Sequence, residues 1–128
     1  MFRTSLDKLE LYTDSTRLQQ VLINLLINAT KFTPSGTISL LLDVDAERKE
    51  AVFTVEDTGC GIPKDELDNI FARFVQLSDF EQGVGLGLAI CKGLVLKMGG
   101  NISVISEEGF GSTFIFTLPM KRPNSWKN

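Results

Sequence analysis

Two pairs of short segments in this chain alternate apolar and polar residues, and a turn joins the members of each pair. The first pair covers residues 38–44 and 51–57 across a charged stretch, and the second covers residues 102–106 and 114–118 across a turn that contains two glycines. Alternation with a period of two is typical of strands that bury one face, so each pair predicts a β-hairpin. A sheet built from such hairpins needs a second layer to cover its apolar face.

Two further segments repeat apolar residues at helical spacing: residues 14–32, which begin at the candidate N-cap Asp14, and residues 86–98, which two glycines follow. Between them, Pro63 opens a short predicted helix through about residue 70. Residues 8–12 alternate like a short edge strand. Together these elements predict an α+β fold, a two-layer α/β sandwich in which about five strands form a mixed sheet and three helices lie on one face.

The composition supports one soluble domain over residues 1–120, followed by a C-terminal tail over residues 121–128. Hydrophobic residues make up 43% of the 128 residues, which is enough for one core. A net charge of −3 with scattered basic residues offers no footprint for nucleic acid, and no apolar run is long enough to span a membrane. We therefore expect no nucleic acid partner and no direct membrane contact.

Histidine is absent from the chain, and its two cysteines, Cys60 and Cys91, are isolated in sequence. This pattern suggests neither a zinc cluster nor a disulfide framework, and it fits a reducing cytoplasm. No secretory signal is expected before the first structured segment.

The helix predicted over residues 14–32 carries an unusual polar row. At about 100° per residue, five polar side chains lie within about 40° of Asn24: Arg17, Gln20, Asn24, Asn28 and Lys31. Four leucines and Ala29 occupy the opposite side, and the row is flanked by Val21, Ile23 and Ile27. Because asparagine is a poor helix former, two asparagines spaced by four residues favour a functional site, although an ordinary solvated face would give a similar pattern.

A carboxylate ends the apolar row of the second predicted strand. Asp57 continues the register of three apolar residues, so it points toward the core, where an unpaired charge would be costly. Gly59 and Gly61 would let a ligand approach the backbone closely, and the exocyclic amine of a purine would supply the missing donor. The alternative is an Asx-turn, in which the loop itself satisfies Asp57.

A glycine cluster, formed by Gly83, Gly85 and Gly87, immediately precedes the third predicted helix. Backbone amides and the positive end of a helix dipole would meet there, which suits a phosphate, although flexible turns use the same residues. Leu88 stands where a dinucleotide fingerprint has its third glycine, and no Gly-Lys-Ser/Thr sequence occurs. These departures argue against a Rossmann site and exclude a standard P-loop.

Taken in order, these segments closely resemble the sequence boxes of the histidine kinase catalytic domain, whose ATPase family also includes gyrase-type, mismatch-repair and chaperone ATPases. The resemblance spans nearly the whole chain. Its motifs are the N box over residues 14–33, the first glycine box over 57–63, the F box over 70–74, the second glycine box over 83–90 and a closing glycine motif over 109–114.

This resemblance implies a site for ATP and Mg²⁺, with Asn28 and Lys31 as the catalytic residues. Asn28 would coordinate the metal through an oxygen that suits this hard ion, Asn24 would assist it, and Lys31 would neutralise phosphate charge. Asp57, supported by Thr113, would accept a hydrogen bond from the adenine amino group. The adenine would be walled by Phe32, Ile70 and Leu88, and space for it would be left by Gly59 and Gly61. The phosphates would face Gly83, Gly85, Leu86 and Gly87. An ATP lid is implied over residues 71–84.

Position 24 separates two functions within this family. Hydrolytic members place a glutamate there to activate water, whereas Asn24 is no general base at neutral pH, so phosphotransfer is favoured over ATP hydrolysis. Because the chain has no histidine, the acceptor would lie on a separate dimerisation and histidine phosphotransfer domain, with a response regulator receiver domain as an indirect partner.

We expect the fragment to be monomeric and cytoplasmic, and it could be the cytoplasmic part of a membrane-anchored sensor. Two alternatives stay open: a non-catalytic ATP-binding regulatory module and a gyrase-type ATPase.

Overall fold

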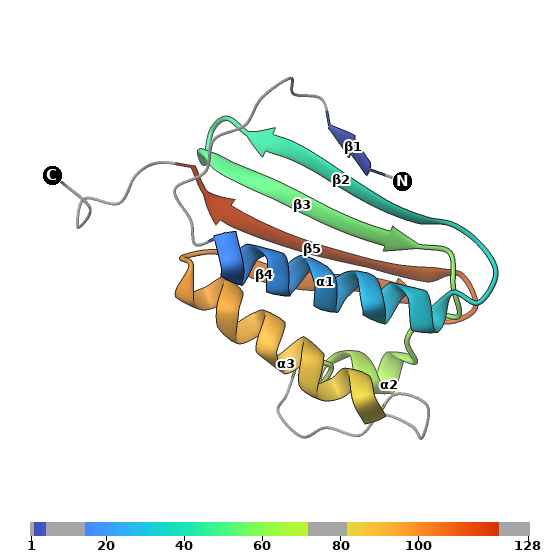
Figure 1. Ribbon diagram of the computed structural model, residues 1–128. Helices are drawn as coiled ribbons and strands as arrows, with labels where there is room; N and C mark the ends of the chain where they lie inside the picture. Colours follow the sequence, from blue (N-terminus) through green and yellow to red (C-terminus); the bar gives the residue numbers. More distant parts are fainter. Residues whose placement is uncertain (1, 5–14, 72–81, 121–128) are drawn as a thin grey trace, which may run out of the picture.

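Five strands form one sheet in the order β1-β2-β3-β5-β4 (Figure 1). The computed structural model describes residues 2–4, 15–71 and 82–120. β1 pairs in parallel with β2, whereas the other neighbouring pairs are antiparallel. The strands are β1 (Phe2–Thr4), β2 (Ile38–Asp45), β3 (Glu50–Asp57), β4 (Asn101–Glu107) and β5 (Gly111–Pro119). The two predicted hairpins therefore provide the four antiparallel strands of the sheet.

The N-terminal edge strand is the part of the sheet that differs from the prediction. We expected it at residues 8–12, which lie outside the described residues, and the strand beside β2 is Phe2–Thr4 instead. Phe2 pairs with Leu40 and Thr4 with Leu42. A strand of three residues is too short to show a recognisable period of two, which is why the sequence pattern does not reveal it.

Three helices, α1 (Ser15–Phe32), α2 (Lys64–Leu67) and α3 (Gln82–Lys97), cover one face of the sheet (Figure 1). α1 and α3 pack against each other and against the central strands β3 and β5. The two-layer α+β sandwich is thus confirmed. Among the helices in the described ranges, none has the length and apolar character needed to cross a membrane.

The boundaries of α2 and α3 differ from the predicted ones. α2 ends at Leu67 rather than near Ile70, because Asn69 and Ile70 donate their N–H groups to carbonyls three residues earlier and the chain continues as turns. α3 begins at Gln82, so the glycine cluster lies within its first turns and not ahead of it.

The early start of α3 runs against local propensity, since each glycine in a helix costs about 1 kcal/mol relative to alanine. Farther along α3, Leu88, Cys91 and Val95 are almost completely buried. Burial of these side chains offsets the cost of the glycines. The helix ends as predicted: Gly99 adopts a φ of 85°, and Gly100 donates its N–H to the Val95 carbonyl over 3.0 Å.

The core lies between β3 and β5 on one side and α1 and α3 on the other. Phe53 of β3 and Phe116 of β5 stack with their ring centroids 4.6 Å apart. Each large apolar side chain that is fully buried stabilises the fold by about 1.5–3 kcal/mol. The opposing helical row consists of Val21, Leu25, Ala29, Leu88, Cys91 and Val95. This packing fixes the ends of β3 and β5 relative to the surface of α1.

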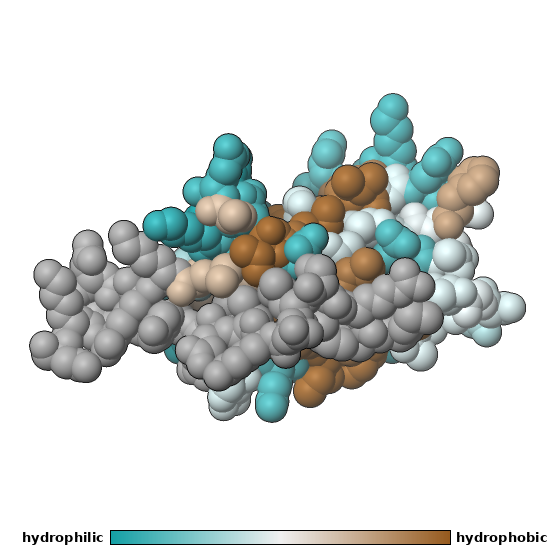
Figure 2. Space-filling view, turned by 90° about the horizontal axis from the view of Figure 1, so that it is seen from above, coloured by the Kyte–Doolittle hydropathy of each residue, from teal (hydrophilic) through white to brown (hydrophobic). Residues whose placement is uncertain are grey.

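β2 is less well covered than the central strands. Its apolar residues are partly buried, whereas alternate residues of β3 are fully buried. A view onto this side of the molecule shows hydrophobic surface between polar side chains (Figure 2). The best-protected part of the sheet is therefore its centre, which is formed by β3 and β5.

Candidate functional site

Asp57 and Ser112 form a buried polar pair at the ends of β3 and β5. The two residues are register partners, and each is 4% exposed. Asp57 Oδ1 accepts a hydrogen bond of 2.9 Å from the Gly59 N–H. The Asx-turn is therefore present, and it uses one carboxylate oxygen. Among the described residues, the other oxygen makes no hydrogen bond, so the turn and a ligand contact are compatible.

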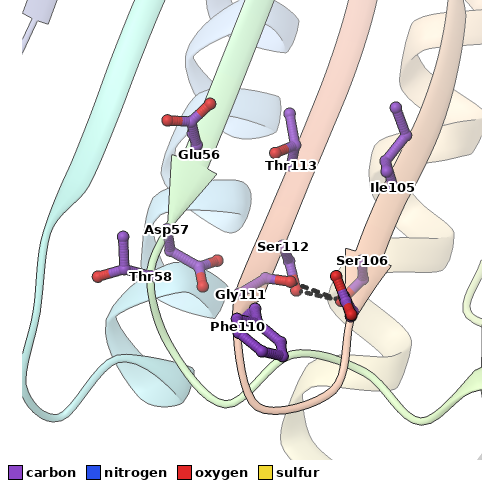
Figure 3. Close-up of a pocket in the computed structure, with 10 residues that line it drawn as sticks. Glu56, Asp57, Thr58, Ile105, Ser106, Phe110, Gly111, Ser112 and Thr113 are labelled. Carbon is purple, nitrogen blue, oxygen red and sulfur yellow. Dashed lines mark hydrogen bonds between the residues drawn. The ribbon is translucent and has the colours of Figure 1, made fainter.

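The hydroxyl beside Asp57 belongs to Ser112 and not to Thr113. Thr113 pairs with Glu56 and therefore points to the opposite face of the sheet from Asp57 (Figure 3). The predicted support of Asp57 by Thr113 is wrong for this reason, because neighbouring residues of a strand face opposite ways. The strand alternation was readable from the sequence: Phe114 and Phe116 face the core, and Ser112 shares their register.

The proton of Ser112 is used inside the protein. Ser106 Oγ accepts from the Ile62 N–H over 2.8 Å and donates to the Gly111 carbonyl over 2.9 Å. Because a hydroxyl has one proton, the 2.8 Å contact between Ser106 and Ser112 has Ser112 as its donor. Ser112 and Asp57 consequently present acceptors only, and the group that fits between them is a donor such as an amine or a water.

The glycines of the loop after β3 bring protein backbone together. A Cβ on Gly59 would lie 2.0 Å from the Phe32 carbonyl oxygen, and one on Gly61 would lie 2.2 Å from the Glu107 carbonyl oxygen. We expected these glycines to leave space for a ligand, but in the structure the space is filled by the end of α1 and by the β4–β5 turn. Gly59 therefore lets the loop after Asp57 approach the end of α1, and Gly61 lets it approach the β4–β5 turn.

The polar row of α1 runs along the boundary between core and solvent. Asn28 is 2% exposed and Asn24 is partly buried. Beside the row, Val21 is buried, whereas Ile23 and Ile27 are 51% and 50% exposed, so the two flanks differ more than the sequence suggested. The exposed members of the row are Arg17, Gln20 and Lys31.

The side-chain oxygen of Asn28 is buried and has no hydrogen-bond partner among the residues that the structure describes. Leaving such an acceptor unsatisfied costs about 1–3 kcal/mol, so a buried amide oxygen without a partner marks a place where a ligand would bind. The described residues contain no group of three or more histidine, cysteine, aspartate or glutamate side chains suited to a metal. A magnesium ion that takes one amide oxygen from the protein and the remainder from phosphates and water fits this arrangement.

Asn24 is directed toward α3. Its Oδ1 accepts from Gln20 Nε2 over 3.0 Å, and its Nδ2 donates to the Gly87 carbonyl over 3.5 Å. The two asparagines of the row therefore differ in their surroundings: Asn28 is buried and unsatisfied, whereas Asn24 joins two helices.

The residues predicted to wall the adenine lie in the core. Phe32, Ile70 and Leu88 are 3%, 1% and 1% exposed, and all belong to the cluster between the layers. Gly83, Gly85 and Gly87 lie in the first turns of α3, and the side chain of Leu86 is outside the described part of the chain. Most of the predicted lid, residues 72–81, is also outside it.

A cavity of about 510 Å³ opens at the end of the sheet (Figure 3). It borders the row formed by Glu56, Thr113 and Ile105, which faces away from the helices, and it includes Asp57 and Ser112 at its edge. No residue of α1 lines it. The cavity therefore reaches the pair of Asp57 and Ser112 but not the polar row of α1.

Comparison with known proteins places the chain in a family of ATPases. Residues 13–122 match the family described as histidine kinase-, DNA gyrase B- and HSP90-like ATPase. The aerobic respiration control sensor protein ArcB of Escherichia coli is 46% identical over 114 residues, which cover 85% of this chain and 14% of ArcB. The chain thus spans a small part of that relative's length.

Solved structures share the fold. The catalytic domain of histidine kinase ThkA superposes with a TM-score of 0.80 and 34% identity, covering 93% of this chain and 76% of that chain. Full-length ShkA, in complex with AMPPNP, gives a TM-score of 0.78 and 37% identity, covering 95% of this chain and 25% of that chain. The chain therefore belongs to the histidine kinase-, DNA gyrase B- and HSP90-like ATPase family, where its relatives are the catalytic domains of two-component sensor histidine kinases.

Proposed function

We propose that this chain binds Mg·ATP on the helical side of the sheet and donates the γ-phosphate to a histidine on a separate dimerisation domain of a two-component sensor kinase. The observation that carries the proposal is the buried, unsatisfied Asn28 oxygen. It lies one helical turn before Phe32, whose carbonyl accepts from Cys60 in the loop that follows Asp57. A metal-binding oxygen and a base-binding carboxylate are thereby held at one end of the fold.

The acceptor pair of Asp57 and Ser112 selects the base. Adenine presents an exocyclic amine as a donor, whereas guanine presents a carbonyl oxygen at the corresponding position of its ring. Two acceptors favour the first and repel the second, and a buried polar group left without its partner gives strong discrimination. This complementarity favours ATP over GTP.

The phosphates belong beside Asn28 and Lys31, which lie three residues apart on one face of α1. Asn28 would hold Mg²⁺ through its Oδ1, and the ion would neutralise phosphate charge when bound. Lys31 is exposed, so its ammonium group is free to move onto a phosphate oxygen. Full-length ShkA, part of which shares this fold, is in complex with the ATP analogue AMPPNP, and that complex supports nucleotide binding by this chain.

In the proposed reaction, a ring nitrogen of the acceptor histidine attacks the γ-phosphorus. The new N–P bond forms as the bond from phosphorus to the bridging oxygen breaks, and that oxygen leaves with its electron pair as part of ADP. The chain supplies positioning and positive charge. Asn24 stands where a hydrolytic relative would need a base, and an amide accepts no proton at neutral pH.

Incubating the chain with γ-labelled ATP and a purified histidine-bearing dimerisation domain of a sensor kinase tests this proposal. We expect label on the dimerisation domain that is stable in alkali and labile in acid, and its loss when the acceptor histidine is replaced by glutamine. Binding of AMPPNP without transfer would instead favour a regulatory ATP-binding module. Rapid phosphate release without any acceptor would favour a gyrase-type ATPase.

The cellular setting follows from the same chemistry. Because its proposed substrate is ATP, we place the chain in the cytoplasm. A response regulator receiver domain would take the phosphoryl group from the histidine in a later step and need not contact this chain directly.

A further inference from the structure

Polar contacts join α1 to the first half of α3. Asn24 Nδ2 donates to the Gly87 carbonyl over 3.5 Å, and one turn later the Cys91 thiol donates to the Val21 carbonyl over 3.7 Å. Asn24 is itself oriented by Gln20, whose amide donates to its Oδ1 over 3.0 Å. Asn24 thus accepts on one side and donates on the other.

The beginning of α3 needs support from outside. Its first turns contain three glycines, each of which favours the helix less than alanine does, and its first four N–H groups have no partner within the helix. Among the described residues outside its own helix, a Cβ added at Gly87 would meet no atom within 4 Å, so none of their side chains packs against the helix at this residue. Firm burial begins at Leu88 and continues at Cys91.

We propose that Asn24 is a positioning residue that holds the glycine-rich first turns of α3 against α1 through the Gly87 carbonyl. The donor of the Asn24 amide is the group that makes this contact, and the same amide can also accept from Gln20. The consequence for nucleotide binding rests on the proposed function: with α3 held in place, its first turns lie ready to face the phosphates. Within the polar row of α1, Asn28 would then contact the ligand, whereas Asn24 contacts the protein.

The contact is tested first without nucleotide, by hydrogen exchange of the α3 amides that bond within the helix, residues 86–89. Asn24→Asp keeps the size of the side chain and its ability to accept but removes the donor, and Asn24→Ala removes both. We expect exchange about three- to ten-fold faster at these amides in either variant, with the amides of β3 and β5 unchanged. Unchanged exchange at residues 86–89 would overturn the proposal, and so would faster exchange throughout the sheet.

Two control variants sharpen the test. Gln20→Ala leaves the Asn24 donor in place and should keep exchange at residues 86–89 within about two-fold of the parent. Gly87→Ala keeps the carbonyl, fits the open space and raises helix propensity, so in the Asn24→Ala background it should restore about five-fold protection. Failure of Gly87→Ala to restore protection would contradict a role for Asn24 in holding this helix.

Titration of the same variants with Mg·AMPPNP separates this inference from the proposed function. Asn24→Ala should weaken binding about three- to ten-fold, and Gly87→Ala should recover part of the loss. If Asn24 were a ligand of the metal, a substitution in α3 could not restore the contact that Asn24→Ala removes. Lack of recovery in the Gly87→Ala variant would therefore show that Asn24 binds the metal instead. If the parent chain binds no nucleotide, the proposed function fails, and the exchange experiment still decides the role of Asn24.

Discussion

Replacing Asp57 by asparagine would alter one acceptor in the candidate site and little else. The new side chain has nearly the same volume, and its carbonyl oxygen can still accept the 2.9 Å hydrogen bond from the Gly59 N–H. The amide nitrogen then occupies the position of the second carboxylate oxygen. A donor would therefore face the adenine amine where the parent chain presents a charged acceptor.

The expected loss of affinity follows from that exchange. A hydrogen bond to a charged group is worth about 1.5–3 kcal/mol, so Asp57→Asn should weaken ATP binding by about ten- to a hundred-fold. The pair is buried, with Asp57 and Ser112 each 4% exposed, which keeps water from replacing the missing acceptor. GTP should lose less, because its base never matched the pair.

Calorimetric titration with AMPPNP measures this change. Glu56→Gln is the matched control, because Glu56 is the neighbouring carboxylate on the exposed face of the same strand and its replacement should leave affinity within about two-fold. Thermal unfolding of each variant verifies that the fold is kept. Equal affinities for the Asp57→Asn variant and the parent would remove Asp57 from the base site and refute the assignment.

Three further predictions concern single residues. Asn28→Ala should abolish the Mg²⁺ dependence of nucleotide binding, measured by titration with and without the ion, and a variant that retains the dependence would defeat the metal assignment. Ser112→Ala should lower AMPPNP affinity about three- to ten-fold, whereas Thr113→Val should leave it unchanged; the opposite order would mean that the strand register does not determine the contact. Burial raises the pKa of the Cys91 thiol from 9.0 to about 11, against a smaller lowering by its hydrogen bond with Asn24. Below pH 9 the thiol is neutral in both the folded and the unfolded state. As the pH rises to about 11, the unfolded state loses this proton first, and the free energy of unfolding falls by roughly 2–3 kcal/mol. Urea unfolding at pH 8 and pH 11 should therefore show a smaller pH effect in Cys91→Ala, and equal pH effects would contradict the burial of a neutral thiol.

The antiparallel part of the fold could be predicted from sequence because burial repeats along whole elements. Phe53 and Val55 on one strand and Phe114 and Phe116 on another alternate over enough residues to define both a strand and its buried face. The parallel edge strand spans only Phe2–Thr4, and no pattern is visible in three residues. Its pairing with β2 depends on contacts that are distant in sequence.

The candidate site was predicted at the level of motifs and less well at the level of contacts. Asp57 is buried where the strand register indicated, and Asn28, a member of the predicted polar row, is buried as well. The family resemblance implied Thr113 as the support of Asp57, whereas the strand register assigns the position beside Asp57 to Ser112. Sequence motifs name residue types, whereas the face on which each residue lies follows from the periodicity.

Tertiary contacts determine what the glycines do. A glycine in a loop can make room for a ligand or for another part of the chain, and the sequence around Gly59 does not distinguish the two. The structure places the end of α1 against this glycine. The three glycines at the start of α3 likewise lower helix propensity, but the helix forms because residues from Leu88 onward pack into the core.

The location of the nucleotide can be measured directly by amide NMR during titration with Mg·AMPPNP. Binding on the helical side of the sheet should shift the amides of residues 24–33, those of residues 57–62 and the side-chain amide of Asn28, saturating at one nucleotide per chain. Shifts confined to Glu56, Ile105 and Phe110 would place the ligand in the cavity on the opposite face and contradict the proposed site. No shifts at millimolar nucleotide would contradict nucleotide binding itself.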